Sequence, residues 1–152
     1  MTGPLGFVLD LERCTGCRAC ELACSTENEL GWGRSWRRVV TFNPAGDPRA
    51  PHHHLSLACN HCAEAPCAAA CPARAFTRDA GTGVLTLGPE RCLGCRYCAW
   101  ACPFEAPLFD GETGVMGKCT FCPERVAAGG EPACVHACPT GALTVEALDD
   151  AV

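Results

Sequence analysis

The chain has 152 residues, 16 of them cysteine, and a formal net charge of −5 at pH 7. This length leaves room for one compact unit or two small ones, and the negative charge argues against a nucleic-acid partner. The start, MTGPLGFVLD, lacks the features of a signal peptide, and no apolar stretch approaches the roughly 20 residues that cross a bilayer, so we expect a soluble protein without direct membrane insertion.

The predicted elements are few and short. Near the start, the apolar segment Gly6–Asp10 predicts a strand, and a helix is expected over Cys20–Leu30. Residues 25–58, which contain two tryptophans and three prolines, are interpreted as a connection that spans an inner module. The remaining elements are a strand at Val84–Leu87, a helix at Cys98–Ala101 and a strand at Ala142–Val145. This mixture predicts an α+β fold.

All 16 cysteines fall into four groups of four. The groups are Cys14, Cys17, Cys20 and Cys24; Cys59, Cys62, Cys67 and Cys71; Cys92, Cys95, Cys98 and Cys102; and Cys119, Cys122, Cys134 and Cys138. The first and third groups have the spacing C-x2-C-x2-C-x3-C, whereas the second and fourth widen the middle gap. A pattern that occurs four times is a strong signal.

The run C-x2-C-x2-C-x3-C-P is typical of bacterial ferredoxins. Three closely spaced thiolates hold three irons of one cluster, whereas the fourth thiolate points away and binds the other cluster of a pair. Proline follows the last cysteine at Pro72, Pro103 and Pro139, where it sets the exit of the chain, and Ser25 stands at the equivalent place in the first group. Zinc prefers paired C-x2-C knuckles, and disulfides need an oxidising compartment, so iron–sulfur clusters are the better interpretation.

The cysteine groups are of two kinds, which indicates a duplicated two-cluster ferredoxin. ERCTGCRACELAC at 12–24 matches ERCLGCRYCAWAC at 90–102, and CAAACPARAFT at 67–77 parallels CVHACPTGALT at 134–144. Spacing alone leaves two ways of pairing the groups: adjacent groups, or a nested scheme that pairs second with third and first with fourth. The loop lengths favour nesting, with an inner module at 55–112 and an outer module at 1–54 plus 113–152.

The elements RCTGCRACELAC, LACNHC, GCRYCAWACPFEAP, KCTFC and CVHACPTGAL occur in this order and resemble the iron–sulfur subunit of dimethyl sulfoxide reductase. More broadly, they resemble the four-cluster subunits that accompany molybdopterin or tungstopterin oxidoreductases. The resemblance covers residues 6–145 and implies two nested ferredoxin-like modules whose small cores surround four 4Fe–4S clusters. Some relatives carry tryptophan in place of one third-group cysteine and hold a 3Fe–4S cluster, but Cys95 stands there in this chain.

The resemblance also implies which thiolates share a cluster. The four implied ligand sets are Cys14, Cys17, Cys20 and Cys138; Cys59, Cys62, Cys67 and Cys102; Cys92, Cys95, Cys98 and Cys71; and Cys119, Cys122, Cys134 and Cys24. The first of these clusters is expected to face a catalytic subunit, and the last to lie towards the electron exit.

The implied function is that of an electron-transfer subunit with no catalytic centre of its own. The expected partners are a pterin-containing catalytic subunit and either an integral membrane quinone-reactive subunit or a soluble acceptor. The alternative is a polyferredoxin-type carrier for a hydrogenase or an aldehyde oxidoreductase. The expected location is the cytoplasm, or the membrane through a partner, or the far side of the membrane after folded export with a signal-bearing partner.

Several histidine, cationic and aromatic residues near the expected ligands could have either a functional or a purely structural role. We expect His61 and His136 to pack around clusters rather than to ligate iron, and His52–His54 to lie in a solvated loop. Positive charges that either raise a cluster potential or face solvent stand at Arg18, Arg96 and Lys118. Core or interface packing is expected for Trp32, Trp36, Tyr97 and Trp100.

Overall fold

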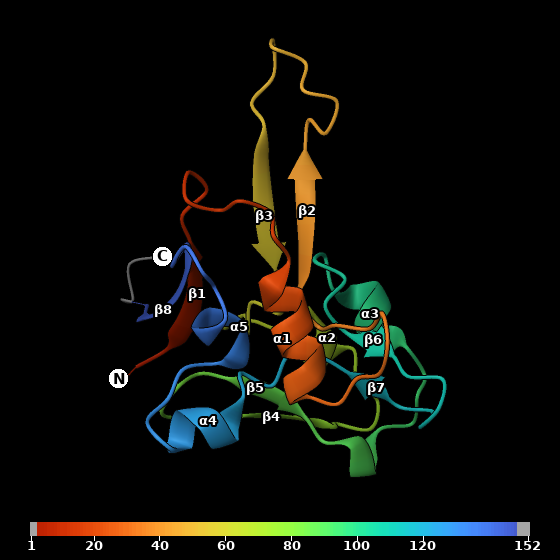
Figure 1. The fold of residues 1–152 in the computed structure, drawn as a ribbon. Helices are drawn as coiled ribbons and strands as arrows, with labels where there is room; N and C mark the ends of the chain where they lie inside the picture. Colours follow the sequence, from red (N-terminus) through yellow and green to blue (C-terminus); the bar gives the residue numbers. More distant parts are fainter. Residues whose placement is uncertain (1–2, 149–152) are drawn as a thin grey trace. The chain divides into compact units, whose positions relative to one another are not determined.

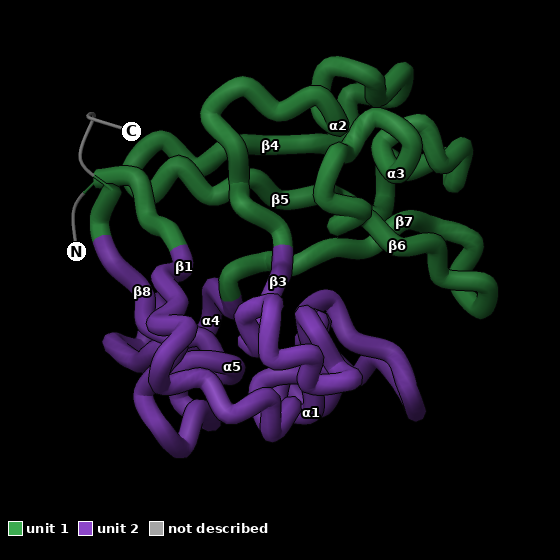
Figure 2. The backbone as a smooth tube through the Cα atoms, turned by 90° about the horizontal axis from the view of Figure 1, so that it is seen from above, with its two compact units in different colours: residues 1–6, 59–121, 147–152 green, residues 7–58, 122–146 purple. Residues whose placement is uncertain are grey.

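The computed structural model of the protein describes residues 3–148. The chain divides into two compact units (Figure 2): unit 1 is built mainly from Cys59–Phe121, and unit 2 from Phe7–Ala58 together with Cys122–Glu146. Both units mix short helices with two-stranded sheets, so the predicted α+β class is confirmed. The ends of the predicted outer module, residues 1–2 and 149–152, lie outside the described residues.

Unit 1 buries thiols together with ordinary apolar side chains. Its elements (Figure 1) are α2 (Pro66–Ala69), β4 (Phe76–Arg78), β5 (Leu85–Leu87), the 3-10 helix η1 (Pro89–Arg91), α3 (Tyr97–Ala101), β6 (Leu108–Phe109) and β7 (Met116–Gly117). Strand β4 pairs antiparallel with β5, and β6 with β7. The core contains Cys67 and Cys98 beside Leu85 and Met116. The cysteines are therefore part of the interior that holds the unit together.

Unit 2 has a similar composition. Its elements are α1 (Ala19–Glu27), β2 (Arg38–Phe42), β3 (His53–Leu57), α4 (Pro123–Ala127), α5 (Ala133–His136) and most of the paired strands β1 (Leu5–Leu9) and β8 (Leu143–Ala147). Cys20 and Cys134 are again buried in the core, here with Val39, Val135 and Leu143. Helices α1 and α5, which carry these two thiols, pack against each other.

Proline determines where α3 stops. A residue before proline is pushed out of the helical region, and Cys102, which precedes Pro103, is extended with φ −83° and ψ 115° directly after α3. Serine replaces proline after Cys24, and α1 accordingly continues to Glu27. The presence of Ser25 thus lengthens one helix.

The backbone repeats the duplication seen in the sequence. Gly16 and Gly94 occupy equivalent places in the first and third groups, and both adopt left-handed conformations, with φ of 68° and 65°. Arg18 and Arg96, two residues further along each group, have φ of 62° and 66°. Left-handed residues let the chain turn tightly between closely spaced cysteines. The two cysteine loops therefore have the same local shape.

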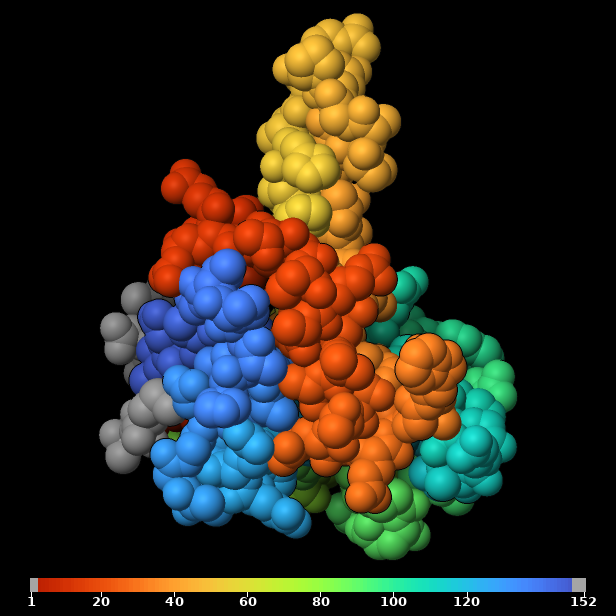
Figure 3. All heavy atoms as spheres, viewed as in Figure 1, coloured from red at the N-terminus to blue at the C-terminus, as the bar shows by residue number. Residues whose placement is uncertain are grey.

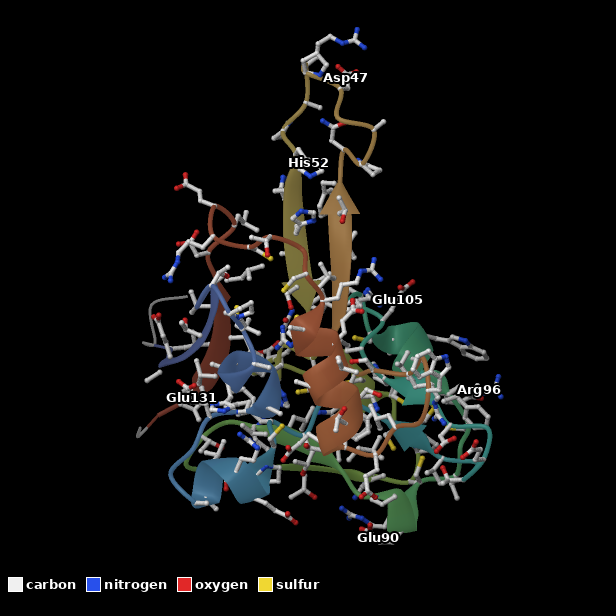
Figure 4. All side chains as sticks on the ribbon, viewed as in Figure 1. Asp47, His52, Glu90, Arg96, Glu105 and Glu131 are labelled. Atoms are coloured by element: carbon white, nitrogen blue, oxygen red, sulfur yellow. The ribbon has the colours of Figure 1, made fainter. Side chains whose placement is uncertain are left out.

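The segment interpreted as a connection contains a β-hairpin, which the sequence did not predict. Strands β2 and β3 pair antiparallel from Arg38 opposite Leu57 to Phe42 opposite His53. The loop between them, residues 43–52, extends clear of the strands (Figure 3), and Asp47 and His52 lie in this outer part (Figure 4). Asn43 holds the loop together through hydrogen bonds with Asp47. The run RVVTF is rich in the β-branched residues that favour strands.

The other predicted elements are confirmed with small shifts at their ends. The predicted strands correspond to β1, β5 and β8, and the two predicted helices to α1 and α3. Among the described residues, no helix is both long and apolar enough to cross a membrane.

Candidate iron–sulfur sites

All 16 cysteines lie within the described residues. Each group contributes at least one buried thiol, among them Cys20, Cys59, Cys98 and Cys134, whereas Cys17 is exposed. Clustered thiols are the donors that iron–sulfur clusters require, because each iron takes one thiolate. The thiols that lie together therefore mark the candidate sites.

A cavity in unit 2 brings the first group together with the end of the fourth. Its lining includes Cys14, Cys17, Cys20 and Cys138, with Val39 and Leu143 among the apolar residues. Helix α1 supplies Cys20, and the turn after α5 supplies Cys138. Residues more than a hundred positions apart in sequence thus surround one space.

Groups that line this cavity hydrogen-bond to two of its thiols. Burial raises the pKa of Cys138, but hydrogen bonds from the Leu143 backbone and the Thr140 hydroxyl, among others, lower it by more. Burial raises the pKa of Cys20, and the Ser56 hydroxyl, 3.4 Å from its sulfur, opposes that rise. Both effects come from groups that line the same cavity.

A second group of thiols in unit 2 joins α1 to the fourth cysteine group. Burial raises the pKa of Cys122, and the negative charge of Cys24 raises it further. The charges of Cys24 and Cys122 likewise raise the pKa of Cys134, after the larger effect of burial. These three thiols therefore lie close enough to repel one another as thiolates. The predicted fourth ligand of this set, Cys119, is assigned to unit 1.

Unit 1 likewise brings thiols from different cysteine groups close together. Burial raises the pKa of Cys67, and the charges of Cys59 and Cys102 add to it. Burial also raises the pKa of Cys98 to about 11, with smaller contributions from Cys92, Cys67 and Cys71. A second-group thiol thus lies near the last cysteine of the third group, and a third-group thiol near the last cysteine of the second.

Backbone N–H groups point at several of these sulfurs. The distances to sulfur are 3.4 Å from His61 N to Cys59, 3.4 Å from Ala75 N to Cys71, 3.4 Å from Gly94 N to Cys92 and 3.3 Å from Met116 N to Cys92. Such donors stabilise thiolate sulfur and raise the reduction potential of a cluster. Within the described residues, no three His, Cys, Asp or Glu side chains converge as ligands of a single metal ion. The donor set fits iron–sulfur clusters.

Two cations are buried beside the thiols, one in each unit. Lys118 and Arg37 are each 2 % exposed. Lys118 donates to the carbonyl oxygens of Leu85 and Cys119, and its charge lowers the pKa of Cys67 against the effect of burial. Of the three cations singled out from the sequence, Lys118 is the buried one, whereas Arg18 and Arg96 are exposed.

The histidines and aromatic residues differ in part from expectation. His61 is buried, and desolvation followed by the charge of Lys118 lowers its pKa to about 3, so the ring is neutral and packs beside ligands as predicted. His136 is exposed at the end of α5, and its packing against a cluster stays a prediction. His53 and His54 are half-buried residues of strand β3 rather than of a solvated loop. Trp32 and Trp100, with relative exposures of 100 % and 77 %, lie outside the core.

Two residues beside the thiols were not predicted from the sequence. Arg37 and Ser56 are buried at the inner ends of β2 and β3, where Arg37 Nη1 donates to Ser56 Oγ over 3.0 Å. No spacing relates them to a cysteine motif, and Arg37 is followed by a second arginine. The available signal was the alternation of the hairpin strands, which buries Arg37 at one end.

Comparisons with known proteins find 4Fe–4S domains in this chain. Residues 51–148 match the 4Fe–4S dicluster domain family, and residues 5–26 match a 4Fe–4S binding domain family. The chain is 40 % identical to the B subunit of anaerobic dimethyl sulfoxide reductase from Haemophilus influenzae, over 95 % of this chain and 75 % of that one. It is 38 % identical to the protein of the same name from Escherichia coli K12, over 99 % and 77 %. It is 41 % identical to thiosulfate reductase electron transfer subunit PhsB of Salmonella typhi, over 99 % and 79 %.

Proposed function

This chain belongs to the family of iron–sulfur electron-transfer subunits that includes the B subunit of anaerobic dimethyl sulfoxide reductase, and we propose that it carries four 4Fe–4S clusters. The observation that supports the proposal most directly is the cavity lined by Cys14, Cys17, Cys20 and Cys138. In two-cluster ferredoxins the last cysteine of one run ligates the other cluster of the pair, and the cavity has this crossed composition.

We assign one cluster to each of four crossed ligand sets. The sets are Cys14, Cys17, Cys20 and Cys138; Cys59, Cys62, Cys67 and Cys102; Cys92, Cys95, Cys98 and Cys71; and Cys119, Cys122, Cys134 and Cys24. Support comes from the cavity and from the mutual effects of the buried thiols on their pKa values, which link Cys67 to Cys102 and Cys134 to Cys24.

The same crossing supports nested ferredoxin-like modules. Unit 2 is made of two segments of chain that precede and follow the main segment of unit 1. This order supports an inner module at 55–112 and an outer module at 1–54 plus 113–152, but the bounds differ: residues 3–6, 113–121 and 147–148 group with unit 1, and residues 55–58 with unit 2. In this scheme Cys24 and Cys138 tie the two distant segments of the outer module together.

The clusters, when bound, would supply one-electron transfer, and the chain holds and tunes them. Thiolates bind the irons, backbone N–H groups such as that of Gly94 donate to sulfur, and buried cations favour added negative charge. The protein is thus a relay, and the substrate reaction belongs to a separate catalytic subunit.

The partner we propose is a pterin-containing catalytic subunit, with a membrane quinone-reactive subunit or a soluble acceptor on the other side of the relay. Two of the relatives are named as components of dimethyl sulfoxide reductases and one as a subunit of thiosulfate reductase. The second candidate, a carrier that diffuses between enzymes, predicts a protein that is monomeric and stable alone. The place of the complex, in the cytoplasm or at either face of the membrane, follows from the partner.

Anaerobic purification of the protein with whatever subunits accompany it tests this function. A brown preparation with about 16 iron and 16 acid-labile sulfide per chain is expected from four clusters. A colourless protein with stoichiometric zinc, or iron for only two clusters, contradicts the proposal. Co-purification of a pterin-containing protein supports the subunit over the carrier.

A further inference from the structure

Arg37 is a buried cation in unit 2, and no ion pair with a carboxylate among the described residues explains its burial. The residue is 2 % exposed. Removing a guanidinium from water is unfavourable by several kcal/mol unless negative charge and hydrogen bonds compensate for it. Among the described residues, its side chain forms no ion pair with Asp or Glu, and its charge acts on the thiols Cys20 and Cys134.

The contacts of the guanidinium hold it between two thiols. Nη1 donates to Ser56 Oγ over 3.0 Å and to the Ser56 carbonyl over 3.3 Å, and the group stacks 4.3 Å from the centre of the Phe7 ring. Ser56 Oγ lies 3.4 Å from Cys20 Sγ. The charge of Arg37 opposes the rise that burial causes in the pKa of Cys20, and it does the same for Cys134. One cation therefore lies beside both thiols.

Two donors of the same guanidinium lack a nitrogen or oxygen acceptor. Nε and Nη2 are buried and make no such hydrogen bond within the described residues, while Arg37 lies close enough to Cys134 for a side-chain hydrogen bond that lowers the pKa of that thiol. Because arginine always remains protonated, the need of these N–H groups for acceptors cannot be removed by loss of a proton. Thiolate and sulfide sulfur of a bound cluster are acceptors of the kind that would satisfy them.

We propose that Arg37 serves both cluster sites of unit 2 as a shared, permanently charged group that raises both reduction potentials. The inference rests on the proposed ligand sets, in which Cys20 and Cys134 belong to different clusters. One-electron reduction adds one negative charge to a cluster and forms or breaks no bond to Arg37. A fixed cation nearby stabilises the reduced state more than the oxidised one. A shared cation of this kind keeps two neighbouring steps of the relay in the same potential range.

Arg37→Met removes the charge and keeps much of the side-chain volume. The holo protein, with any subunit that co-purifies, is titrated with dithionite, and each cluster is followed by electron paramagnetic resonance. Signals are assigned with Cys14→Ser and Cys122→Ser, which disturb one unit 2 cluster each. We expect at least a tenfold smaller reduction equilibrium constant at both unit 2 clusters, a potential about 59 mV lower for a one-electron couple. Unit 1 clusters should keep their potentials.

Two further variants serve as controls. Arg37→Lys keeps a charge and should restore most of the shift. Arg49→Gln removes the same charge from an 87 % exposed side chain in the β2–β3 loop and should leave all potentials unchanged. Unchanged potentials in Arg37→Met with full iron content overturn the inference, as does an equal shift at all four clusters.

The experiment still tests the role of Arg37 if the Arg37→Met variant binds iron poorly. Loss of about half of the iron, from the two unit 2 sites alone, supports a shared role at both. Loss from one site only, or from all four, shows that Arg37 does not serve the pair. If the wild-type protein itself lacks four clusters, the proposed function fails, and that result is distinct from a four-cluster protein in which Arg37 has no effect.

Discussion

Gly94 faces the carbonyl oxygen of Gly114 so closely that a Cβ atom on Gly94 would stand well inside van der Waals contact with it. Gly94 lies between Cys92 and Cys95, has a φ of 65°, and donates its N–H to the Cys92 sulfur. The equivalent Gly16 faces the ring of His54, which is a side chain and can move. The third-group loop is therefore less tolerant of a side chain at its glycine than the first-group loop is.

Gly94→Ala should destabilise the third-group loop. The left-handed conformation alone is unfavourable by about 1–2 kcal/mol for a residue with a Cβ, and the backbone clash adds to it. We expect a lower midpoint for the thermal loss of visible absorbance and faster loss of iron. Gly111→Ala is the matched control, because nothing lies within 4 Å of its Cβ position, and it should shift the midpoint little. Equal stability of the two variants contradicts this interpretation of the loop.

Cys138→Ser tests the crossed ligand sets. If Cys138 completes the cavity with Cys14, Cys17 and Cys20, the substitution should alter the spectroscopic signal of that cluster and leave the one held by Cys122 and Cys134 unchanged. Cys122→Ser is the counterpart and should alter the other signal. Electron paramagnetic resonance of the reduced variants resolves the two. An altered Cys122 cluster in Cys138→Ser would show that the last cysteine serves its own motif.

Removal of the clusters should unfold the chain. Buried thiols make up much of both small cores beside a few apolar side chains such as Leu85 and Leu143, so removal of the clusters would break the bonds that join these thiols. We expect an iron chelator under reducing conditions to abolish far-ultraviolet circular dichroism in step with visible absorbance. A bleached protein that retains native secondary structure and cooperative thermal unfolding would contradict this prediction.

Cysteine spacing made the short elements and the chemistry of the site predictable. The motifs are local, so a helix near Cys20 and another near Cys98 follow from neighbouring residues alone. Proline carries similar information, since Pro103 ends α3, whereas Ser25 allows α1 to continue. The duplication extended these predictions from one cysteine loop to its copy, as the matching φ values of Arg18 and Arg96 illustrate.

Features that depend on distant contacts were not predictable. Arg37 and Arg38 are neighbours with the same chemistry, and only the former is fully buried, because the packing of Phe7 and Ser56 selects it. The β2–β3 hairpin was not predicted, because the prolines of its loop indicated an irregular connection in spite of the strand propensity of the flanking residues. His136 lies between ligands in sequence but faces solvent at the end of a short helix.

Trp32 is a fully exposed tryptophan in unit 2. It lines a groove with Arg18, Leu22 and Arg34, next to the first cysteine group. Exposed tryptophan is rare on a free surface and common at the centre of interfaces. Trp32→Ala should change the free energy of unfolding by at most about 0.5 kcal/mol, because the side chain packs against little.

In a complex that docks at this groove, the same Trp32→Ala variant should weaken partner binding by about thirtyfold, the effect of a 2 kcal/mol interface residue. Trp100→Ala, in unit 1 and 77 % exposed, is the comparison, since it removes the same ring from another unit. Binding of the catalytic subunit is measured for both variants and for the wild-type protein. If both bind as the wild type does, the groove is not the docking surface. If the wild-type protein binds no such subunit and is monomeric, the carrier replaces the relay subunit, because a diffusing ferredoxin needs no permanent interface at Trp32.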